Sequence, residues 1–275
     1  MHRDHVQARD LTVGYSTLSH RVGAIEPAQW WARADVVVVI QTGGGDSDPG
    51  LGRELARLES EGARTVVLES VGVARSRNEV LRHARTRYVL FSDDDVTVDF
   101  EGVCAVVDRM QEEGLAVAMA RAVDSEGNLR KRYPAREEPL TLYNSGKAAT
   151  YEMVVDVTRT RQSGVWFDEG FGAGVERYLG DEYIFIADAL RAGLSARAIP
   201  EVVAAHPVES SGSRWGTPED ADARAAVLDR VFGHLAIAGK LVFAARHRAR
   251  LGGARGAWRF VRSTPRSRAR RRMPR

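Results

Sequence analysis

Residues 36–40 form an uninterrupted run, Val-Val-Val-Val-Ile, which is typical of a strand buried on both faces of a sheet. Three other apolar segments, 11–15, 65–68 and 88–91, have the length of strands, and residues 51–58 have the apolar spacing of a helix. Strands that alternate with helices indicate a mostly parallel sheet covered by helices on both faces. We therefore predict an α/β fold for this chain.

The second half of the chain continues this pattern less regularly. Strands are expected at 115–123 and 129–133, joined by a turn, and strand-rich sequence continues over 151–158. A glycine-rich loop then leads into a helix that begins near Asp181, and Thr217 is a good N-cap for a later helix. These patterns predict further strands followed by a helical extension.

Three consecutive carboxylates, Asp93, Asp94 and Asp95, follow the predicted strand at 88–91. Like charges held together where water is scarce are costly unless a cation neutralises them. Oxygen ligands suit Mg²⁺ or Mn²⁺, which usually keep open positions for substrate phosphates. The acids therefore indicate a site for a divalent metal and a diphosphate. A solvated turn or a helix N-cap is the alternative for such a run.

Other polar segments also follow predicted strands. Ser16 and Thr17 come after the first strand, residues 41–45 come after the second, and a basic turn at 72–78 precedes a helical pattern that begins at Glu79. Ligands of open α/β sheets bind beyond the carboxyl ends of the strands. We therefore expect these segments and the three acids to line one crevice.

Composition limits the class of protein. The 275 residues are 44% hydrophobic, which is enough for one sizeable core. The single cysteine, Cys104, excludes an internal disulfide and a zinc site of the usual thiolate kind. The sequence has no uncharged apolar stretch of about 18 residues and lacks the pattern of a signal peptide. We expect a cytoplasmic protein that does not span a membrane.

The formal net charge of +3 is unevenly distributed. Residues 246–275 contain 12 Arg and no Lys, Asp or Glu, so the rest has 28 of the 40 basic residues against 37 acidic ones, a net charge of −9. Such a tail suits an anionic membrane surface or nucleic acid, and a solvated terminus without a dedicated partner is the alternative. Interleaved apolar residues favour the membrane and make nucleic acid the weaker choice; they are Leu251, Trp258, Phe260 and Val261.

Three blocks of sequence, in this order, resemble the family 2 glycosyltransferases of the GT-A fold. They are residues 72–78, residues 91–95 (Phe-Ser-Asp-Asp-Asp), and residues 167–191 together with Gly193. Their combination is more specific than any single block, and the likeness extends over roughly residues 11–206. The resemblance implies a metal-assisted transferase that uses a nucleotide-sugar donor and usually inverts the anomeric centre.

The resemblance also assigns site residues. Asp93 and Asp95 are placed at the donor diphosphate and at the metal, with Asp95 preferred as the direct metal ligand. Asp94 is placed at the ribose, with a turn-structuring role as the alternative. His206 resembles a histidine that some relatives bring to the metal or acceptor site. The other nucleotide-sugar-binding positions are Ser16, Thr17, Gln41, Arg77 and Asn78. Many relatives have an Asp where this chain has Gln41, so the contacts to the base stay open.

Two adjacent acids at the start of the helix expected near Asp181 resemble the catalytic pair of the family. Relatives usually show Glu then Asp, whereas this chain has Asp181 then Glu182. Matching by order makes Glu182 the general base, with Asp181 as its rival. In an inverting transfer, the base removes the proton of the acceptor hydroxyl while its oxygen attacks the anomeric carbon opposite the leaving diphosphate. The metal stabilises the charge that develops on that diphosphate.

The predicted function is therefore sugar transfer from a nucleotide-sugar, UDP being the commonest choice in the family, to a glycan, a lipid-linked saccharide or a small molecule. We predict a GT-A catalytic domain at 1–212, bracing helices at 213–250, and a basic tail at 251–275 that is disordered or lies on the membrane surface. A sugar-nucleotide nucleotidyltransferase and a non-catalytic glycan- or membrane-binding relative are the alternatives. No glycine-rich phosphate loop follows the first strand, which counts against a nucleotidyltransferase. The acids at 93–95 and 181–182 are intact, which counts against a non-catalytic relative.

Overall fold

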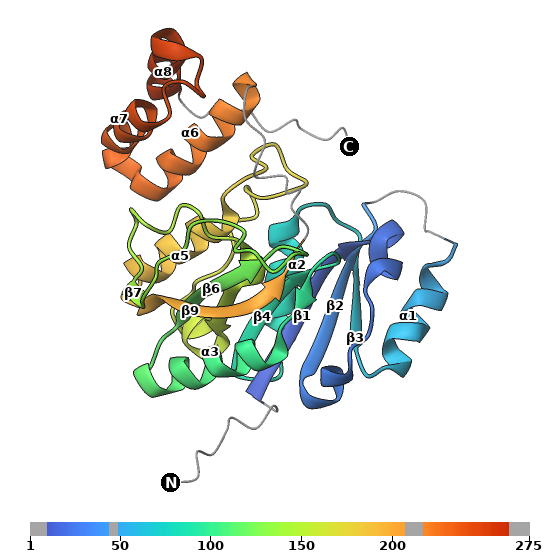
Figure 1. Ribbon diagram of the computed structural model, residues 1–275. Helices are drawn as coiled ribbons and strands as arrows, with labels where there is room; N and C mark the ends of the chain where they lie inside the picture. The colour runs from blue at the N-terminus through green and yellow to red at the C-terminus, as the bar shows by residue number, and fades with distance from the viewer. Residues whose placement is uncertain (1–9, 44–48, 207–216, 264–275) are drawn as a thin grey trace.

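The computed structural model describes residues 10–43, 49–206 and 217–263. Within them, a nine-stranded sheet has the order β3-β2-β1-β4-β8-β6-β9-β5, and β7 pairs with β9 (Figure 1). The first four strands run parallel, as do β6 and β9, while β8 lies antiparallel between β4 and β6. The predicted α/β fold with a mixed, mostly parallel sheet is confirmed. The strands are β1 Leu11–Leu18, β2 Asp35–Gln41, β3 Arg64–Leu68, β4 Tyr88–Asp93, β5 Thr97–Val98, β6 Val117–Val123, β7 Glu138–Pro139, β8 Met153–Asp156 and β9 Ala196–Ala205.

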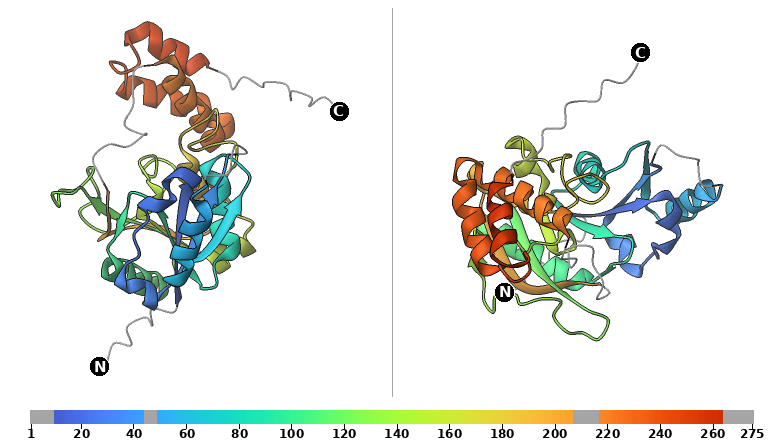
Figure 2. Two further views of the ribbon diagram at one scale, coloured as in Figure 1. Left: turned by 90° about the vertical axis from the view of Figure 1, so that its right-hand side faces the viewer. Right: turned by 90° about the horizontal axis from the view of Figure 1, so that it is seen from above.

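Helices cover both faces of this sheet. One face carries α1 (Leu51–Ser60) and α3 (Phe100–Glu113), and the other carries α2 (Val73–His83), α4 (Val157–Gln162) and α5 (Asp181–Arg191). A separate group at one end of the sheet packs on α5 through its first helix (Figures 1 and 2). This group consists of α6 (Pro218–Phe232), α7 (Ala236–Arg246) and α8 (Gly253–Arg262). Short 3-10 segments are Ser19–Ala24, Gln29–Arg33, Thr150–Glu152 and Gly233–Leu235.

The run at 36–40 is the doubly buried strand that the sequence predicts. Val36, Val38 and Ile40 belong to the core beneath α1 and α3, whereas Val37 and Val39 belong to the core beneath α2 and α5. All five are 2% exposed or less. Because successive side chains of a strand point to opposite faces, a fully apolar run is required where both faces are covered.

The expected basic turn at 72–78 is wrong, because helix α2 already begins at Val73. Gly72, with φ +113, makes the sharp entry into the helix, and Ala74, Asn78 and Leu81 recur at helical spacing on its buried side. The local basic character therefore hid a helical pattern. Residues 75–78 reach the site from the first two turns of a helix, which holds them more rigidly than a loop does.

Two strand predictions also need correction. Residues 129–133 form no strand, since only an isolated bridge joins Leu129 to Val123, and the hydroxyl of Tyr133 donates to Glu152 instead. Strand β8 ends at Asp156 rather than continuing to 158. The carboxylate of Asp156 caps α4 by accepting a hydrogen bond of 3.0 Å from the backbone nitrogen of Arg159, so the chain turns into a helix there.

Part of the predicted basic tail is folded. Residues 253–262 form α8, in which Phe260 is 1% exposed and stacks on Phe243 with ring centroids 5.2 Å apart. The rest of the predicted tail, 264–275, and the glycines at 44 and 45 lie outside the described residues. None of the helices in the described parts of the chain combines the length and the apolar character needed to cross a bilayer.

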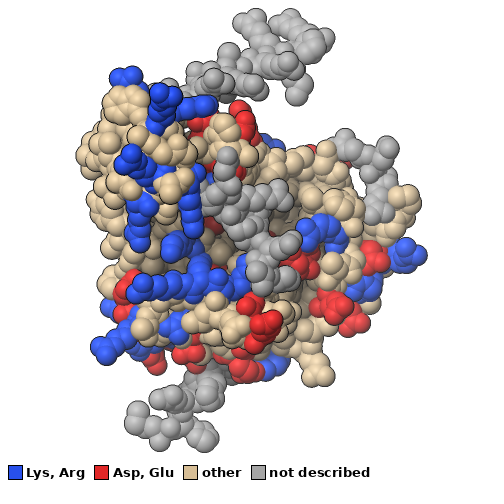
Figure 3. Space-filling view, turned by 45° about the horizontal axis from the view of Figure 1, so that its top comes forward, with Lys and Arg blue, Asp and Glu red and all other residues tan. Residues whose placement is uncertain are grey.

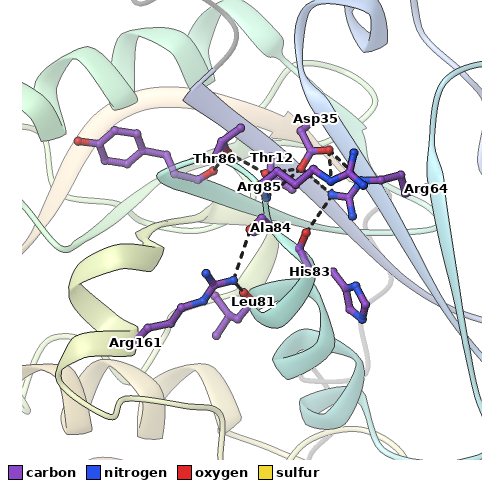
Figure 4. A network of polar contacts seen from close by, with 10 residues as sticks. Thr12, Asp35, Arg64, Leu81, His83, Ala84, Arg85, Thr86 and Arg161 are labelled. Atoms are coloured by element: carbon purple, nitrogen blue, oxygen red, sulfur yellow. Dashed lines mark hydrogen bonds and ion pairs between the residues drawn. The ribbon is translucent and has the colours of Figure 1, made fainter.

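A polar network joins β1, β2, β3 and α2 at the end of the sheet where these strands begin, opposite the predicted crevice (Figure 4). Asp35, the first residue of β2, accepts hydrogen bonds from Thr12 Oγ1 at 2.8 Å, Arg64 Nη2 at 2.7 Å and the backbone nitrogen of Arg85 at 3.2 Å. Arg64 also donates to the carbonyl of His83 at 3.0 Å. One carboxylate therefore fixes the register of three strands and the end of a helix.

We predict that Asp35→Asn lowers the free energy of unfolding by about 1–3 kcal/mol, because hydrogen bonds to a charged, largely buried acceptor are lost. Urea denaturation followed by circular dichroism measures this change. Glu101→Gln is the matched control, since its pair with Arg33 is 74% and 51% exposed and contributes little. Equal loss in the two variants would contradict the role assigned to the network.

Candidate active site

The carboxyl ends of β1 and β4 lie side by side and supply the first groups of the site. Ser16 aligns with Asp93 across these parallel strands. Asp93 is the last residue of β4, and its side chain is 33% exposed. The Ser16 hydroxyl oxygen is buried and has no hydrogen-bond partner among the described residues. Parallel pairing thus brings two polar residues that are distant in sequence to the same end of the sheet.

Arg77 reaches the same edge from α2. Its side chain is 9% exposed, its Nη1 donates to Oδ2 of Asp181, and its Nη2 lies 3.6 Å from Oδ1 of Asp93. Glu182 also attracts this guanidinium. Since a buried cation needs counter-charges, Arg77 holds the end of β4 and the start of α5 together.

Asp94 is held by the segment that follows β1. Oγ1 of Thr17 donates to Oδ2 of Asp94 at 2.5 Å, and Arg21 pairs with the other carboxylate oxygen. Burial raises the pKa of Asp94, while the Thr17 hydrogen bond and the Arg21 charge oppose that rise. Because both oxygens are engaged, Asp94 structures the turn in this arrangement.

Asp95 faces His206, which follows β9. Nε2 of His206 lies 3.4 Å from Oδ1 of Asp95, and the imidazole stacks on Tyr151 with ring centroids 4.7 Å apart. Arg21 lies 3.4 Å from the other oxygen of Asp95. Burial raises the pKa of Asp93, which His206, Arg77 and Asp95 also influence, so Asp93 belongs to the same electrostatic cluster.

The side chains of Asp95 and His206 offer donor atoms that suit a metal. Carboxylate oxygen and imidazole nitrogen are both ligands of divalent ions such as Mn²⁺, and Asp95 and His206 lie close enough to share one. Across the described ranges, no three His, Cys, Asp or Glu side chains are already grouped as a ready metal site. The donor set therefore fits a divalent ion in chemistry, and Asp93 belongs to the same electrostatic cluster.

The paired acids open α5. Asp181 is 3% exposed and is engaged by Arg77, whereas Glu182 is half-buried. Burial raises the pKa of Glu182 well above its ordinary value, the charge of Asp181 raises it further, and Arg77 opposes the rise. A carboxylate with a raised pKa at a helix start is suited to accept a proton.

The glycine-rich loop before α5 packs directly on α2. Gly172 has φ +97, and a Cβ there would lie 2.8 Å from Oδ1 of Asp181 and 2.9 Å from Cγ1 of Val73. The backbone nitrogen of Val73 donates to the carbonyl of Ala173 at 2.9 Å. Only a residue without a side chain leaves Asp181 in its position against Arg77.

Two predicted donor-binding residues hold loops around the site. Nε2 of Gln41 donates to the carbonyl of Gly72 at 3.0 Å. The amide of Asn78 exchanges two hydrogen bonds with the backbone of Phe167, at 2.9 and 3.0 Å. The structure thus gathers Ser16, Thr17, Arg77, the three acids, the acid pair and His206 at one edge, with Gln41 and Asn78 bracing that edge.

Sequence reasoning missed two residues of this cluster, Arg21 and Tyr151. Arg21 lies in the 3-10 segment after β1 and reaches the acids only because β1 and β4 are neighbours. Tyr151 lies in another 3-10 segment and supports His206. A local signal existed only for Arg21, as a basic residue soon after the first strand.

Comparison with known proteins identifies the family and the fold of this chain. The family model described as Glycosyl transferase family 2 matches residues 28–188. A solved structure of S. aureus TarS residues 1–349 with UDP-GlcNAc is similar at a TM-score of 0.61 and 13% identity, over 87% of this chain and 73% of that one. The same TarS fragment with UDP has a TM-score of 0.58 and 14% identity, over 90% and 73%. In sequence, no curated protein shows a significant match.

A longer TarS structure is similar at a TM-score of 0.58 and 14% identity, and the likeness covers 86% of this chain and 43% of that one. At such identities the structural likeness establishes the GT-A fold alone. The family match spans more than half of the chain, so the chain belongs to glycosyl transferase family 2. It has the GT-A fold and is a glycosyltransferase.

We predict that Gly172→Ala reduces turnover at least about tenfold, because its Cβ displaces Asp181 and with it Arg77. Gly62→Ala is the matched control, since Gly62 has φ +93 and a Cβ there meets nothing within 4 Å. Both variants lose stability through backbone strain, of about 1–3 kcal/mol. Steady-state kinetics and thermal melting separate the two effects, and equal turnover in both variants would refute the crowding argument.

Proposed function

We propose that this protein transfers a sugar from a UDP-sugar to an acceptor hydroxyl with inversion, assisted by a divalent metal. The observation that carries the proposal is the buried Arg77, which touches Asp93 on the donor side and Asp181 on the acceptor side. Its position supports one continuous site in which diphosphate and base are held at a fixed separation. The family membership supports nucleotide-sugar glycosyl transfer as the reaction class.

We assign Glu182 as the general base. Asp181 is buried and its carboxylate is taken up by Arg77, so it has little freedom to reach an acceptor. Glu182 is more accessible and has a raised pKa, which strengthens it as a proton acceptor. In this assignment, Asp181 positions Arg77 and raises the basicity of its neighbour. Glu182 takes the proton of the acceptor hydroxyl.

We assign the metal to Asp95 and His206, with Asp93 as the third group. A bound ion would supply positive charge to the donor diphosphate and to the leaving group. The chain itself adds Arg21, which lies beside Asp94 and Asp95 and is placed to meet a phosphate once the acids bind a cation.

The acceptor remains a glycan, a lipid-linked saccharide or a small molecule, and the association of the basic tail with anionic membranes remains a prediction. The alternative of a non-catalytic relative makes an opposite prediction for the donor. It requires that no nucleotide-sugar is hydrolysed or transferred under any metal condition.

Asp95→Asn is expected to remove the dependence of donor binding on Mn²⁺, because it removes a charged ligand of the ion. Isothermal titration of UDP-GlcNAc and a panel of other nucleotide-sugars, with Mn²⁺ and with a chelator, measures this dependence. Asp94→Asn is the comparison, since its carboxylate is held by Thr17 and Arg21. It should weaken donor binding while leaving the effect of Mn²⁺ in place. If donor binding by the wild type is the same with Mn²⁺ and with a chelator, the metal assignment is wrong.

Glu182→Gln is expected to lower kcat by about 10²–10⁴-fold and to leave donor binding unchanged, because the proton acceptor is lost. The wild-type rate should rise with pH through the raised pKa of Glu182, since only the ionised form accepts a proton. Asp181→Asn removes a like charge, so the pKa of Glu182 falls and the acidic limb of the kcat profile moves to lower pH. Loss of turnover in Asp181→Asn with activity kept in Glu182→Gln would reverse the assignment.

A further inference from the structure

Helix α7 turns an apolar face toward solvent. Ile237 is 64% exposed, Leu241 is 50% and Val242 is 71%. Ala238 and Ala245 are exposed as well, and at 100° per residue these five positions lie on one side of the helix. We call this surface the α7 face. These five positions carry no charge, and the exposed Arg246 at the end of the helix borders them.

The opposite side of α7 is packed normally. Lys240 is 3% exposed, its Nζ lies 2.6 Å from Oδ1 of Asp229, and it donates to the carbonyl of Ser263 at 2.6 Å. Ala236 and Ala244 are buried as well. The helix therefore buries its one lysine and exposes its large aliphatic residues. This inversion of the usual pattern indicates that the α7 face is covered by something apolar.

Helix α8 supplies the charge beside this face. Its buried residue Phe260 packs on α7, while its solvent side carries Trp258, at 57% exposed, together with Arg255, Arg259 and Arg262. The guanidinium of Arg262 lies 4.5 Å from the centre of a Trp258 ring. Lys and Arg gather over these helices next to uncharged surface (Figure 3). No acid occurs anywhere from 246 to 275.

We propose that the α7 face, with the outer side of α8, docks on the surface of an anionic lipid bilayer. Aliphatic residues enter the boundary between headgroups and acyl chains, Trp258 lies at headgroup level, and the arginines meet lipid phosphates. The α7 face lies outside the basic tail that the sequence singles out at 251–275, whereas the outer side of α8 is the folded part of that tail. Helix α7 lies in the plane of the membrane surface, because its 11 residues are too few to span a bilayer.

Charge argues against a second copy of the chain as the occupant. A two-fold contact through this face would bring the arginines of two α8 helices together, with no acid between 246 and 275 to neutralise them. An anionic bilayer is complementary to the same surface.

Docking would also orient the site. Helix α6 is tied to the catalytic core because Nε of Arg230 lies 2.8 Å from Asp168 and its Nη2 lies 2.6 Å from Asp188. The C-terminal helices lie beyond the end of the sheet from which the site residues project (Figure 1). A lipid-linked acceptor would thus be favoured. This consequence rests on the proposed function, whereas the docking proposal does not depend on it.

The test uses the full chain and sedimentation with vesicles of phosphatidylcholine alone or with 30% phosphatidylglycerol, a roughly physiological share of anionic lipid. We expect binding to the anionic vesicles, and a loss of about tenfold or more in partitioning for Ile237→Asp/Leu241→Asp/Val242→Asp. Val67→Asp is the control, since Val67 is 44% exposed on edge strand β3, and it should bind as wild type. Hydrolysis of UDP-sugar in solution should be equal in all three proteins, which shows that the core is folded.

Three outcomes overturn the proposal. The triple variant binds vesicles as tightly as wild type, which assigns binding to the tail alone. Wild type binds neither kind of vesicle. Analytical ultracentrifugation shows a dimer that the triple variant dissociates, which makes the α7 face an interface between copies. If wild type binds anionic vesicles but hydrolyses no UDP-sugar, only the proposed function is refuted.

Discussion

The site depends on one buried cation, the guanidinium of Arg77, and on the acids around it. Asp93 and Asp181 come from positions 88 residues apart, and each alone would be destabilised by loss of water. Arg77 neutralises both, so the end of β4 and the start of α5 are held at one place. Removing any member leaves a buried charge without its partner, which is more costly than never having formed the pair.

The surrounding fold is arranged to keep this cluster in position. Parallel pairing of β1 with β4 places Thr17 against Asp94, and the glycines of the loop before α5 allow that loop to lie on α2. At the opposite edge, Asp35 fixes the register of the same strands. One end of the sheet thus holds in register the strands whose other ends carry the candidate site.

The C-terminal helices add a second property to this scaffold. They are joined to α5 through buried apolar contacts and the Arg230 pairs, yet α7 exposes its aliphatic residues. A helix that buries a lysine and exposes isoleucine, leucine and valine is stable in water only because α6 and α8 hold it. The same exposure is favourable against lipid, where the apolar surface leaves water.

Local patterns in the sequence were sufficient for the sheet, for the acids at the end of β4 and for the acid pair at the start of α5. A doubly buried strand requires a continuous apolar run, and carboxylates clustered at a strand end are costly unless a cation neutralises them or water solvates them, so both features are visible without a structure. The helix over 73–78 had a local helical spacing that its basic residues obscured. Only the tertiary structure decided that Asp181 is held by Arg77, that Arg21 and Tyr151 join the candidate site, and that α7 faces outward. Each of these depends on contacts between residues far apart in the chain, and no local spacing records which surfaces meet.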